Sequence, residues 1–300
     1  MADLDNKKLS EVLSNKCNLG FLPTPVHELE RLNDLYPQYR IFIKRDDQTG
    51  LATGGNKTRK LEYLIQAAID NYRDTVITAG AQQSNHCRQT AAAAAQLGLK
   101  CHLLLGGEEP SKYSGNLLLS KLLGAIIHFS SSDRKGEQLP QLKKDLESSG
   151  HRCYTLPYGG SNLIGSLGFV NAMAELKEQE NELGLEFDHI VFASSSGGTQ
   201  AGLILGKELF GINANLHAIS IDKEGISGKA LEDIVLKLVN EGSEYLSLGK
   251  RFSNTDCQLN RNYDAFGYGQ LTSEEISSIK TLAKKEGILL DPVYTGRAFN

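Results

Sequence analysis

The sequence of 300 residues has little with which to build a disulfide framework or a metal site. Its five cysteines are odd in number and widely spread, and no C-x-x-C pair occurs. The seven histidines are also scattered, without an H-E-x-x-H motif or a comparable ligand spacing. These absences predict free thiols in a reducing compartment, which favours a cytoplasmic protein, and no bound metal ion.

Basic tracts and long apolar runs are missing as well. The formal net charge is −4, and the densest basic run, K-T-R-K at residues 57–60, is too short to follow a nucleic-acid backbone. No uninterrupted apolar run reaches the length that spans a bilayer. The first residues also lack the apolar core of a signal peptide. We therefore expect neither a nucleic-acid partner nor a membrane.

Apolar runs of strand length alternate with helical patterns along almost the whole chain. The runs lie at residues 40–46, 75–80, 101–106, 125–130, 152–157, 189–194, 216–222 and 288–293. Helical spacing occupies residues 61–69, 84–97, 165–183, 199–210 and 273–286. This alternation is typical of parallel sheets covered by helices, and the length suggests about two domains. Because no linker or repeat separates them, we expect the two domains to be interleaved.

Three turns rich in glycine or small residues stand where a strand passes into a helix: GGNKTRK, GAQQSNHCR and SSSGGTQAG. In open α/β sheets, ligands bind at the carboxyl ends of the strands, beside helix N-termini. The three turns therefore predict one composite pocket.

The first of these turns has an unusual order of charges. Lys57, Arg59 and Lys60 occupy the first turn of the predicted helix, where the positive end of the dipole disfavours cations. An anion in the pocket, or a covalent adduct that carries one, would account for them. The neighbouring cations would also lower the pKa of Lys57 from about 10.4 and free its amine for imine chemistry.

The other two turns each allow two interpretations. SSSGGTQAG is either an ordinary connection or a site for a phosphate smaller than a nucleotide, because its glycines let backbone amides converge on an anion. In the QQSN segment, Ser84 either caps a helix or helps to bind a carboxylate with Asn85. A phosphate site together with an activated lysine suggests pyridoxal phosphate.

Six segments carry a further signal through their order along the chain: FLPTPVHELERL, IFIKRDDQTGLATGGNKTRKLEYL, ITAGAQQSNHCRQTAAAAAQLGLKCHLLL, SSSGGTQAG, GYG and GILLDPVYTGRA. In that order they resemble the D-cysteine desulfhydrase and 1-aminocyclopropane-1-carboxylate deaminase family, pyridoxal-phosphate enzymes of the tryptophan-synthase-β type. The sequence departs from the family at Ala81 and Gln82, where members more often have a glycine followed by an apolar residue. Members also generally continue through another helix beyond the VYTGRAF segment.

The resemblance implies an α/β fold of two interleaved, open, twisted and mostly parallel sheets with helices on both faces. It places residues 1–59 and 167–300 in a large cofactor-binding domain and residues 60–166 in a small domain. We expect a homodimer that acts on a small amino-acid substrate.

The resemblance also implies the roles of individual residues. Lys57 would bind pyridoxal 5′-phosphate as an imine and act as the base. The other cofactor-binding residues would be Asn56, Asn85, Ser196, Gly197, Gly198, Thr199 and Thr295. The substrate carboxylate would bind to Gln83, Ser84 and Asn85. The substrate would face Tyr268 and Tyr294, and the catalytic groups would be Lys57, Ser84, Tyr268 and Tyr294.

Thr295 bears on the choice between the two activities. Deaminases usually have an acidic residue after the tyrosine that corresponds to Tyr294, and that acid pairs with the pyridine nitrogen of the cofactor. Here the residue is Thr295, and a neutral hydroxyl holds a proton on that nitrogen less firmly. We therefore expect β-elimination from D-cysteine. Deamination of the cyclopropane substrate, a lyase for another β-substituted amino acid such as cysteate, and a non-catalytic binder of cofactor or small anions stay open.

Overall fold

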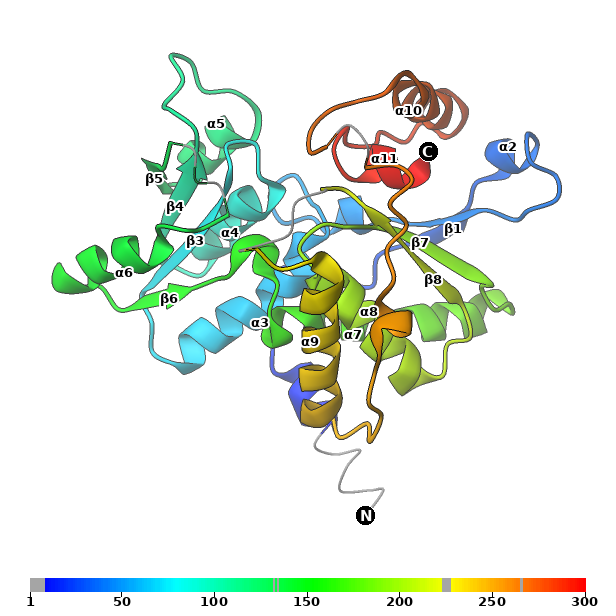
Figure 1. Ribbon diagram of the computed structural model, residues 1–300, viewed down its shortest axis with the longest axis horizontal. Coiled ribbons are helices and arrows are strands. Elements are labelled where there is room, and N and C mark those ends of the chain that lie inside the picture. Colours follow the sequence, from blue (N-terminus) through cyan, green and yellow to red (C-terminus); the bar gives the residue numbers. More distant parts are fainter. Residues whose placement is uncertain (1–8, 132, 134, 223–227, 265–266) are drawn as a thin grey trace. The chain divides into compact units, whose positions relative to one another are not determined.

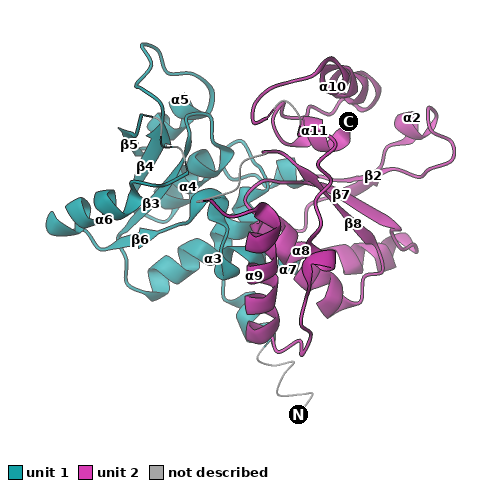
Figure 2. Cartoon of the chain, in the orientation of Figure 1, with its two compact units in different colours: residues 1–22, 46–171 teal, residues 23–45, 172–300 magenta. Residues whose placement is uncertain are grey.

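The computed structural model describes residues 9–131, 133, 135–222, 228–264 and 267–300. The chain divides into two compact units (Figure 2). The first unit comprises the described residues up to Leu22 together with Asp46–Asn171, and the second comprises Pro23–Arg45 and Ala172–Asn300. These limits differ from the domain boundaries expected from the sequence, which stay a prediction.

The first unit is built on a parallel sheet in the order β5-β4-β3-β6 (Figure 1). Its strands are β3 (Thr75–Ala81), β4 (Lys100–Gly106), β5 (Ile126–Phe129) and β6 (Cys153–Thr155). Its helices are α3 (Lys57–Asp70), α4 (Asn85–Gln96), α5 (Gly115–Leu122) and α6 (Leu139–Ser148), with 3-10 turns at Asp46–Gln48 and Tyr158–Gly160. All four strands coincide with apolar runs of the sequence, and the α/β class is confirmed.

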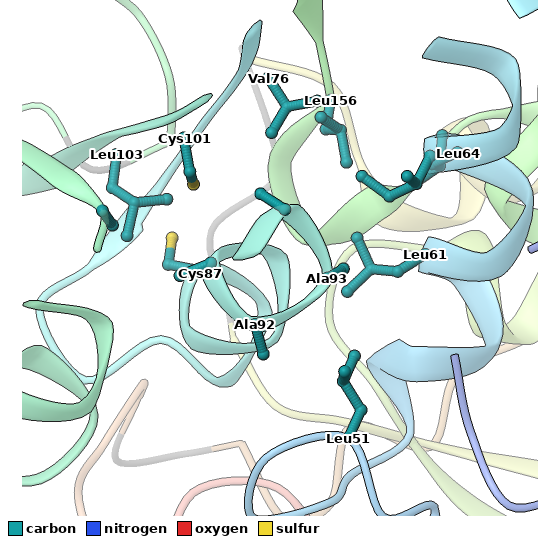
Figure 3. Packing of buried hydrophobic residues seen from close by; sticks show 14 of the residues in the cluster. Leu51, Leu61, Leu64, Val76, Cys87, Ala92, Ala93, Cys101, Leu103 and Leu156 are labelled. Carbon is teal, nitrogen blue, oxygen red and sulfur yellow. The ribbon is translucent and has the colours of Figure 1, made fainter. Parts of the chain in front are cut away.

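The sheet of the first unit is covered on both faces. Because side chains alternate along a strand, Val76 and Leu103 face a core shared with α3, α4 and α5, and Ile77 and Leu104 face α6. Figure 3 shows the larger core, in which Leu61 of α3 lies against the alanines of α4. Short alanine side chains let the helix approach the strands closely, and this brings the start of α4 to the carboxyl end of β3.

The second unit contains two short sheets. Strands β1 (Val26–Glu28) and β2 (Phe42–Lys44) pair antiparallel, and β7 (His189–Ser194) and β8 (Asn215–Ser220) pair in parallel. The helices of this part are α2 (Glu30–Asn33), α8 (Gly198–Phe210), α9 (Leu231–Tyr245), α10 (Ser273–Glu286) and α11 (Thr295–Phe299), with a 3-10 turn at Asn254–Cys257. Helix α7 (Leu163–Leu183) carries the chain from the first unit into the second.

One predicted strand is wrong. Residues 288–293 form irregular structure and a turn, although their apolar run is typical of a strand. The Asp291 carboxylate accepts hydrogen bonds from the backbone N–H groups of Val293, Tyr294 and Thr295. Pro292 has no N–H with which to continue a ladder. The segment therefore turns and starts α11. Among the described residues, no helix combines the length and the apolar character needed to cross a membrane.

Candidate active site

The loop before α3 is held in a conformation that requires glycine. Gly54 and Gly55 have φ angles of +72° and +124°, and a Cβ atom on either would clash, with Asp47 O and Gln89 Nε2 respectively. The Thr49 hydroxyl donates to Gly55 O, at an oxygen–oxygen distance of 2.9 Å, and accepts from Gly55 N at the same distance. The loop therefore fixes where the helix begins, which is at Lys57.

Arg59 and Lys60, in the first turn of α3, are buried and have partners within the protein. Arg59 donates to both carboxylate oxygens of Asp46, at 2.8 Å each, and only 1% of its side chain is exposed. Lys60 Nζ donates to Gly159 O and Ser161 Oγ at 3.1 Å. Burial, and next the charge of Lys57, lower the pKa of Lys60 well below its ordinary value. The expectation that a bound anion accounts for all three cations is therefore wrong for Arg59, which Asp46 neutralises.

Lys57 differs from these neighbours because it is partly exposed. Its Nζ lies 3.4 Å from Asn56 Oδ1. The Gly168 Cα on α7 packs so closely on the backbone of Arg59 that a Cβ there would clash. The first turn of α3 therefore requires glycine at position 168, which was not predicted although the G-S-L-G motif at residues 165–168 offered a signal.

The start of α4 combines a helix cap with a cluster of amides. Ser84 is the N-cap, and its Oγ accepts from Cys87 N at 3.2 Å. The capping interpretation of Ser84 is thus confirmed, while its hydroxyl proton is not used by the cap. Asn85 Oδ1 accepts from Nδ2 of Asn116, at 2.8 Å, and the Gln83 side chain accepts from the backbone N–H of Asn116. Asn116 lies 31 residues from Asn85, so no local pattern could have indicated it.

Buried polar atoms of α4, two of them on side chains that contact the Gly54–Gly55 loop, are open to a further polar group. In the described part of the chain, Arg88 Nη1, Gln89 Nε2 and His86 Nδ1 are buried without a hydrogen-bond partner. The first two can only donate. Because Thr78 Oγ1 donates to Leu156 O, it accepts from His86 Nε2–H, which leaves Nδ1 as an acceptor. Burial lowers the pKa of His86 to about 3 and keeps the ring neutral.

In the second unit, the loop between β7 and α8 uses backbone groups. Gly197, with φ +85°, is the N-cap of α8, and the helix begins at Gly198. Ser194 Oγ donates to Gln200 Oε1 at 2.8 Å, and Gln200 Nε2 donates to Gln258 O. This buried pair fixes the first turn of α8. The backbone N–H groups at such a helix start suit a phosphate.

The two predicted tyrosines lie together in this unit. The hydroxyls of Tyr268 and Tyr294 are 2.9 Å apart, and their rings meet edge to face with centroids 6.0 Å apart. The buried Arg297 guanidinium donates to Gly267 O and Gln270 O on either side of Tyr268, at 3.1 and 2.7 Å. The hydrogen bond lets one phenol hold a proton while the other gives or takes one.

Thr295 is tied to an acid. Its hydroxyl donates to Asp291 Oδ2 at 2.6 Å and accepts from Asp291 N at 2.9 Å. One lone pair of the hydroxyl oxygen is left for a further donor. Thr295 can therefore meet another polar group as an acceptor while its proton stays with Asp291.

The predicted residues thus fall into groups within each unit. Asn56 and Lys57 share one turn of the first unit, and Gln83, Ser84 and Asn85 share another. In the second unit, Ser196, Gly197, Gly198 and Thr199 open α8, and Tyr268 contacts Tyr294. The roles of these residues stay predictions. Arg88, Asn116, Asp291 and Arg297 were missed because their partners are distant in sequence or, for Asp291, because its apolar surroundings predicted a strand.

Residues 18–300 match the family model described as pyridoxal-phosphate dependent enzyme. The D-cysteine desulfhydrase of Klebsiella pneumoniae (strain 342) is 42% identical over 282 residues, which cover 92% of this chain and 84% of the relative. The bifunctional D-cysteine desulfhydrase/1-aminocyclopropane-1-carboxylate deaminase, mitochondrial, of Arabidopsis thaliana is 40% identical over 298 residues, covering 95% of this chain and 72% of the relative.

A solved structure described as a homologue of ACC deaminase is similar over 97% of this chain and 87% of its own, with a TM-score of 0.87 and 36% identity. The fold expected from the resemblance is thereby confirmed. Relatives with both names are about equally similar to this chain.

Proposed function

Because this chain belongs to the family of pyridoxal-phosphate dependent enzymes that includes D-cysteine desulfhydrases and ACC deaminases, we propose that it is a D-cysteine desulfhydrase. The reaction consumes D-cysteine and water and yields pyruvate, hydrogen sulfide and ammonia. The cofactor is pyridoxal 5′-phosphate. When bound, it supplies an electron sink for the electron pair left at Cα after the proton is removed.

The residues of the first unit would hold the cofactor and take the proton. Lys57 would bind the cofactor aldehyde through its amine and, once displaced by the substrate amine, remove the proton from Cα. Gln83, Ser84 and Asn85 would bind the substrate carboxylate at the start of α4. The unpaired donors Arg88 Nη1 and Gln89 Nε2 support a polar ligand beside the Gly54–Gly55 loop.

The residues of the second unit would bind the phosphate and assist the departing sulfur. The N–H groups and hydroxyls of Ser196–Thr199 would hold the phosphate. The hydrogen-bonded pair Tyr268 and Tyr294 would deliver a proton to the sulfur as the Cβ–S bond breaks. The electron pair of the Cα–H bond becomes the Cα–Cβ double bond, and the product then adds water and loses ammonia.

The observation that supports the choice of D-cysteine is Thr295, which has a hydroxyl at the position where, by the resemblance, deaminases usually have an acid. The hydrogen bond from Thr295 to Asp291 makes the difference between a threonine and an acid at this position smaller. The Asp291 carboxylate holds the hydroxyl proton, so the hydroxyl oxygen favours a proton donor as its other partner. Deamination of 1-aminocyclopropane-1-carboxylate, with 2-oxobutanoate and ammonia as products, is therefore the second candidate. The name of the Arabidopsis relative, which joins both activities, supports keeping it.

One screen tests the proposal. Purified protein loaded with the cofactor is offered D-cysteine, L-cysteine, β-chloroalanine, cysteate and 1-aminocyclopropane-1-carboxylate, and released pyruvate, 2-oxobutanoate and sulfide are measured. We expect pyruvate and sulfide in equal amounts from D-cysteine and little product from the cyclopropane substrate. Efficient formation of 2-oxobutanoate would favour the deaminase. A protein that binds cofactor and releases no oxo acid from any substrate would be a non-catalytic binder.

The remaining expectations belong to this proposal. A homodimer in the cytoplasm is the state in which we expect the enzyme to act on its small amino-acid substrate. Sedimentation of the purified protein measures its oligomeric state, and a monomer with full activity would contradict the dimer.

A further inference from the structure

A chain of hydrogen bonds in the first unit joins the starts of α3, α4 and α5. Arg88 Nη2 donates to Gly54 O at 2.9 Å, three residues before Lys57, and Arg88 Nε donates to Asn116 Oδ1 at 2.9 Å. Asn116 Nδ2 in turn donates to Asn85 Oδ1 at 2.8 Å and to Gln83 O at 2.9 Å. Only 4% of Arg88 is exposed, so water cannot easily replace these bonds.

The chemistry of the guanidinium sets the direction of the whole chain. Arginine can only donate, so the amide of Asn116 must turn its oxygen toward Arg88 and its NH2 group toward Asn85. Asn85 must then turn its own oxygen toward Asn116. Its NH2 group is left to face away from Asn116, as a donor.

A glycine at 115 lets the chain close tightly. Gly115 has φ +54°, and a Cβ atom at this position would clash with Gln83 Oε1, which accepts from the backbone N–H of Asn116 at 2.8 Å. The start of α5 is therefore fitted against the start of α4. Asn116 binds Gln83 through both its backbone and its side chain, and Gln83 and Asn85 are held as one unit.

We propose that Arg88 and Asn116 are positioning residues that make Asn85 a hydrogen-bond donor toward the cofactor. This proposal rests on the proposed function and on the resemblance, which implies that Asn85 binds the cofactor, and it takes the Asn85 amide to lie near the phenolic oxygen of the cofactor. A donor there stabilises the oxygen as an anion, whereas an acceptor would favour its protonated form. Arg88 also holds the Gly54 carbonyl, so the same side chain sets the direction of the Asn85 amide and the loop that leads to Lys57.

The Asn116→Asp substitution reverses the direction of the chain. One carboxylate oxygen still accepts from Arg88, but the other now faces Asn85 Oδ1, and two acceptors repel. The Asn85 amide turns over to donate to the new carboxylate and presents its oxygen to the cofactor. We expect the pKa of the cofactor phenol, followed by its visible absorption over a pH titration without substrate, to rise by about one unit or more. Affinity for the cofactor, measured by equilibrium dialysis, should fall about tenfold.

Two further variants make the test specific. Asn181→Asp adds the same charge at an exposed position and should leave the absorption titration unchanged. Arg88→Met removes the donor to Asn116 Oδ1, so that only Gln83 O still orients the Asn116 amide, and the same pKa should rise by a smaller amount. If Asn116→Asp fails to fold, the proposal is tested with Arg88→Met alone. Thermal unfolding of the Arg88→Met protein without cofactor then shows whether that variant is folded.

The outcomes separate this proposal from the function on which it rests. If the unmodified protein forms no visible cofactor band at all, the proposed function fails. If the band forms and its titration is unchanged in folded Asn116→Asp and Arg88→Met proteins, only the positioning role is overturned. A purely structural role would lower the melting temperature without moving the pKa of the bound cofactor.

Discussion

Arg59 of the first unit and Arg297 of the second are both almost completely buried, and their charges are balanced in different ways. Arg59 of the first unit is 1% exposed and pairs with Asp46, of which 20% is exposed. Arg297 of the second unit is also 1% exposed, but its carboxylate partner Glu275 is 2% exposed. Arg297 further donates to three backbone carbonyls, those of Ile221, Gly267 and Gln270.

The different partners of Arg59 and Arg297 show which segments each arginine holds in place. Arg59 of α3 balances the charge of Asp46 in the 3-10 turn Asp46–Gln48, and Lys57 is the partly exposed amine on the same turn of α3. Arg297 instead ties the end of β8, the loop that carries Tyr268, and α10 to the segment of Tyr294. Under the proposed function, the first unit would supply reactive side chains, whereas the second would supply a framework that positions hydroxyls and backbone amides.

Removal of Lys57 should produce the largest loss of activity. Under the proposed function, Lys57→Ala takes away both the cofactor anchor and the base, so pyruvate release should fall by more than about 10³-fold. Lys60 cannot replace it, because its buried amine is held by Gly159 O and Ser161 Oγ. Turnover of D-cysteine and mass spectrometry after borohydride reduction measure the effect. Lys144→Ala, at an exposed position, is the control. A cofactor adduct still trapped in Lys57→Ala protein would show that another lysine is the anchor.

Substitution of Arg59 and of Arg297 should lower the stability by different amounts. Arg297→Leu leaves Glu275 and backbone carbonyls buried without their donor, and it should lower the free energy of unfolding by about 3–5 kcal/mol. Arg59→Leu leaves Asp46, which water can reach, and should cost about 1–3 kcal/mol. Urea denaturation of both variants measures the difference, with the exposed Arg40→Leu as the control. Equal losses for Arg59 and Arg297 would remove the distinction between the two environments.

The sequence predicted the parts of the molecule that rest on local patterns. Strand β7 and helix α10 begin and end at the predicted residues, because periodicity and caps are local signals. The partners of the buried arginines are different, since Glu275 lies 22 residues from Arg297 and Asp46 lies 13 from Arg59. No spacing rule indicates such pairs. Residues 288–293 show the converse, because a carboxylate that caps the next turn overrides an apolar run.

The bond between Thr295 and Asp291 predicts a moderate effect on the cofactor, under the proposed role of Thr295. In Asp291→Asn, the amide oxygen can still accept from Val293 and Tyr294, but the NH2 group donates to the Thr295 hydroxyl. The hydroxyl proton then turns toward the ring nitrogen, whose pKa should fall by about one unit, or 1.4 kcal/mol. Nitrogen NMR of protein loaded with ¹⁵N-labelled cofactor reports this protonation directly. In a Thr295→Val background the Asp291→Asn change should have no further effect, and a full effect there would assign the shift to charge alone.

Acid should lower the stability of the first unit more than that of the second, because the buried histidines His86 and His102 lie in the first unit. Burial lowers the pKa of His86 to about 3 and that of His102 to about 4, the latter with help from His128, 3.0 Å away. The histidines of the second unit, His27, His189 and His217, are exposed. The unfolded chain binds protons at these two sites from about pH 6.5 downward, while the folded chain does not. Their contribution to stability is therefore complete above pH 6.5 and is lost as the pH falls, by up to about 1.4 kcal/mol per pH unit for each histidine. Urea denaturation between pH 7.5 and 4.5 measures this slope, which His102→Gln should reduce and His27→Gln should leave unchanged. If the slope of His102→Gln equals that of the unmodified protein, protonation of His102 is not coupled to unfolding.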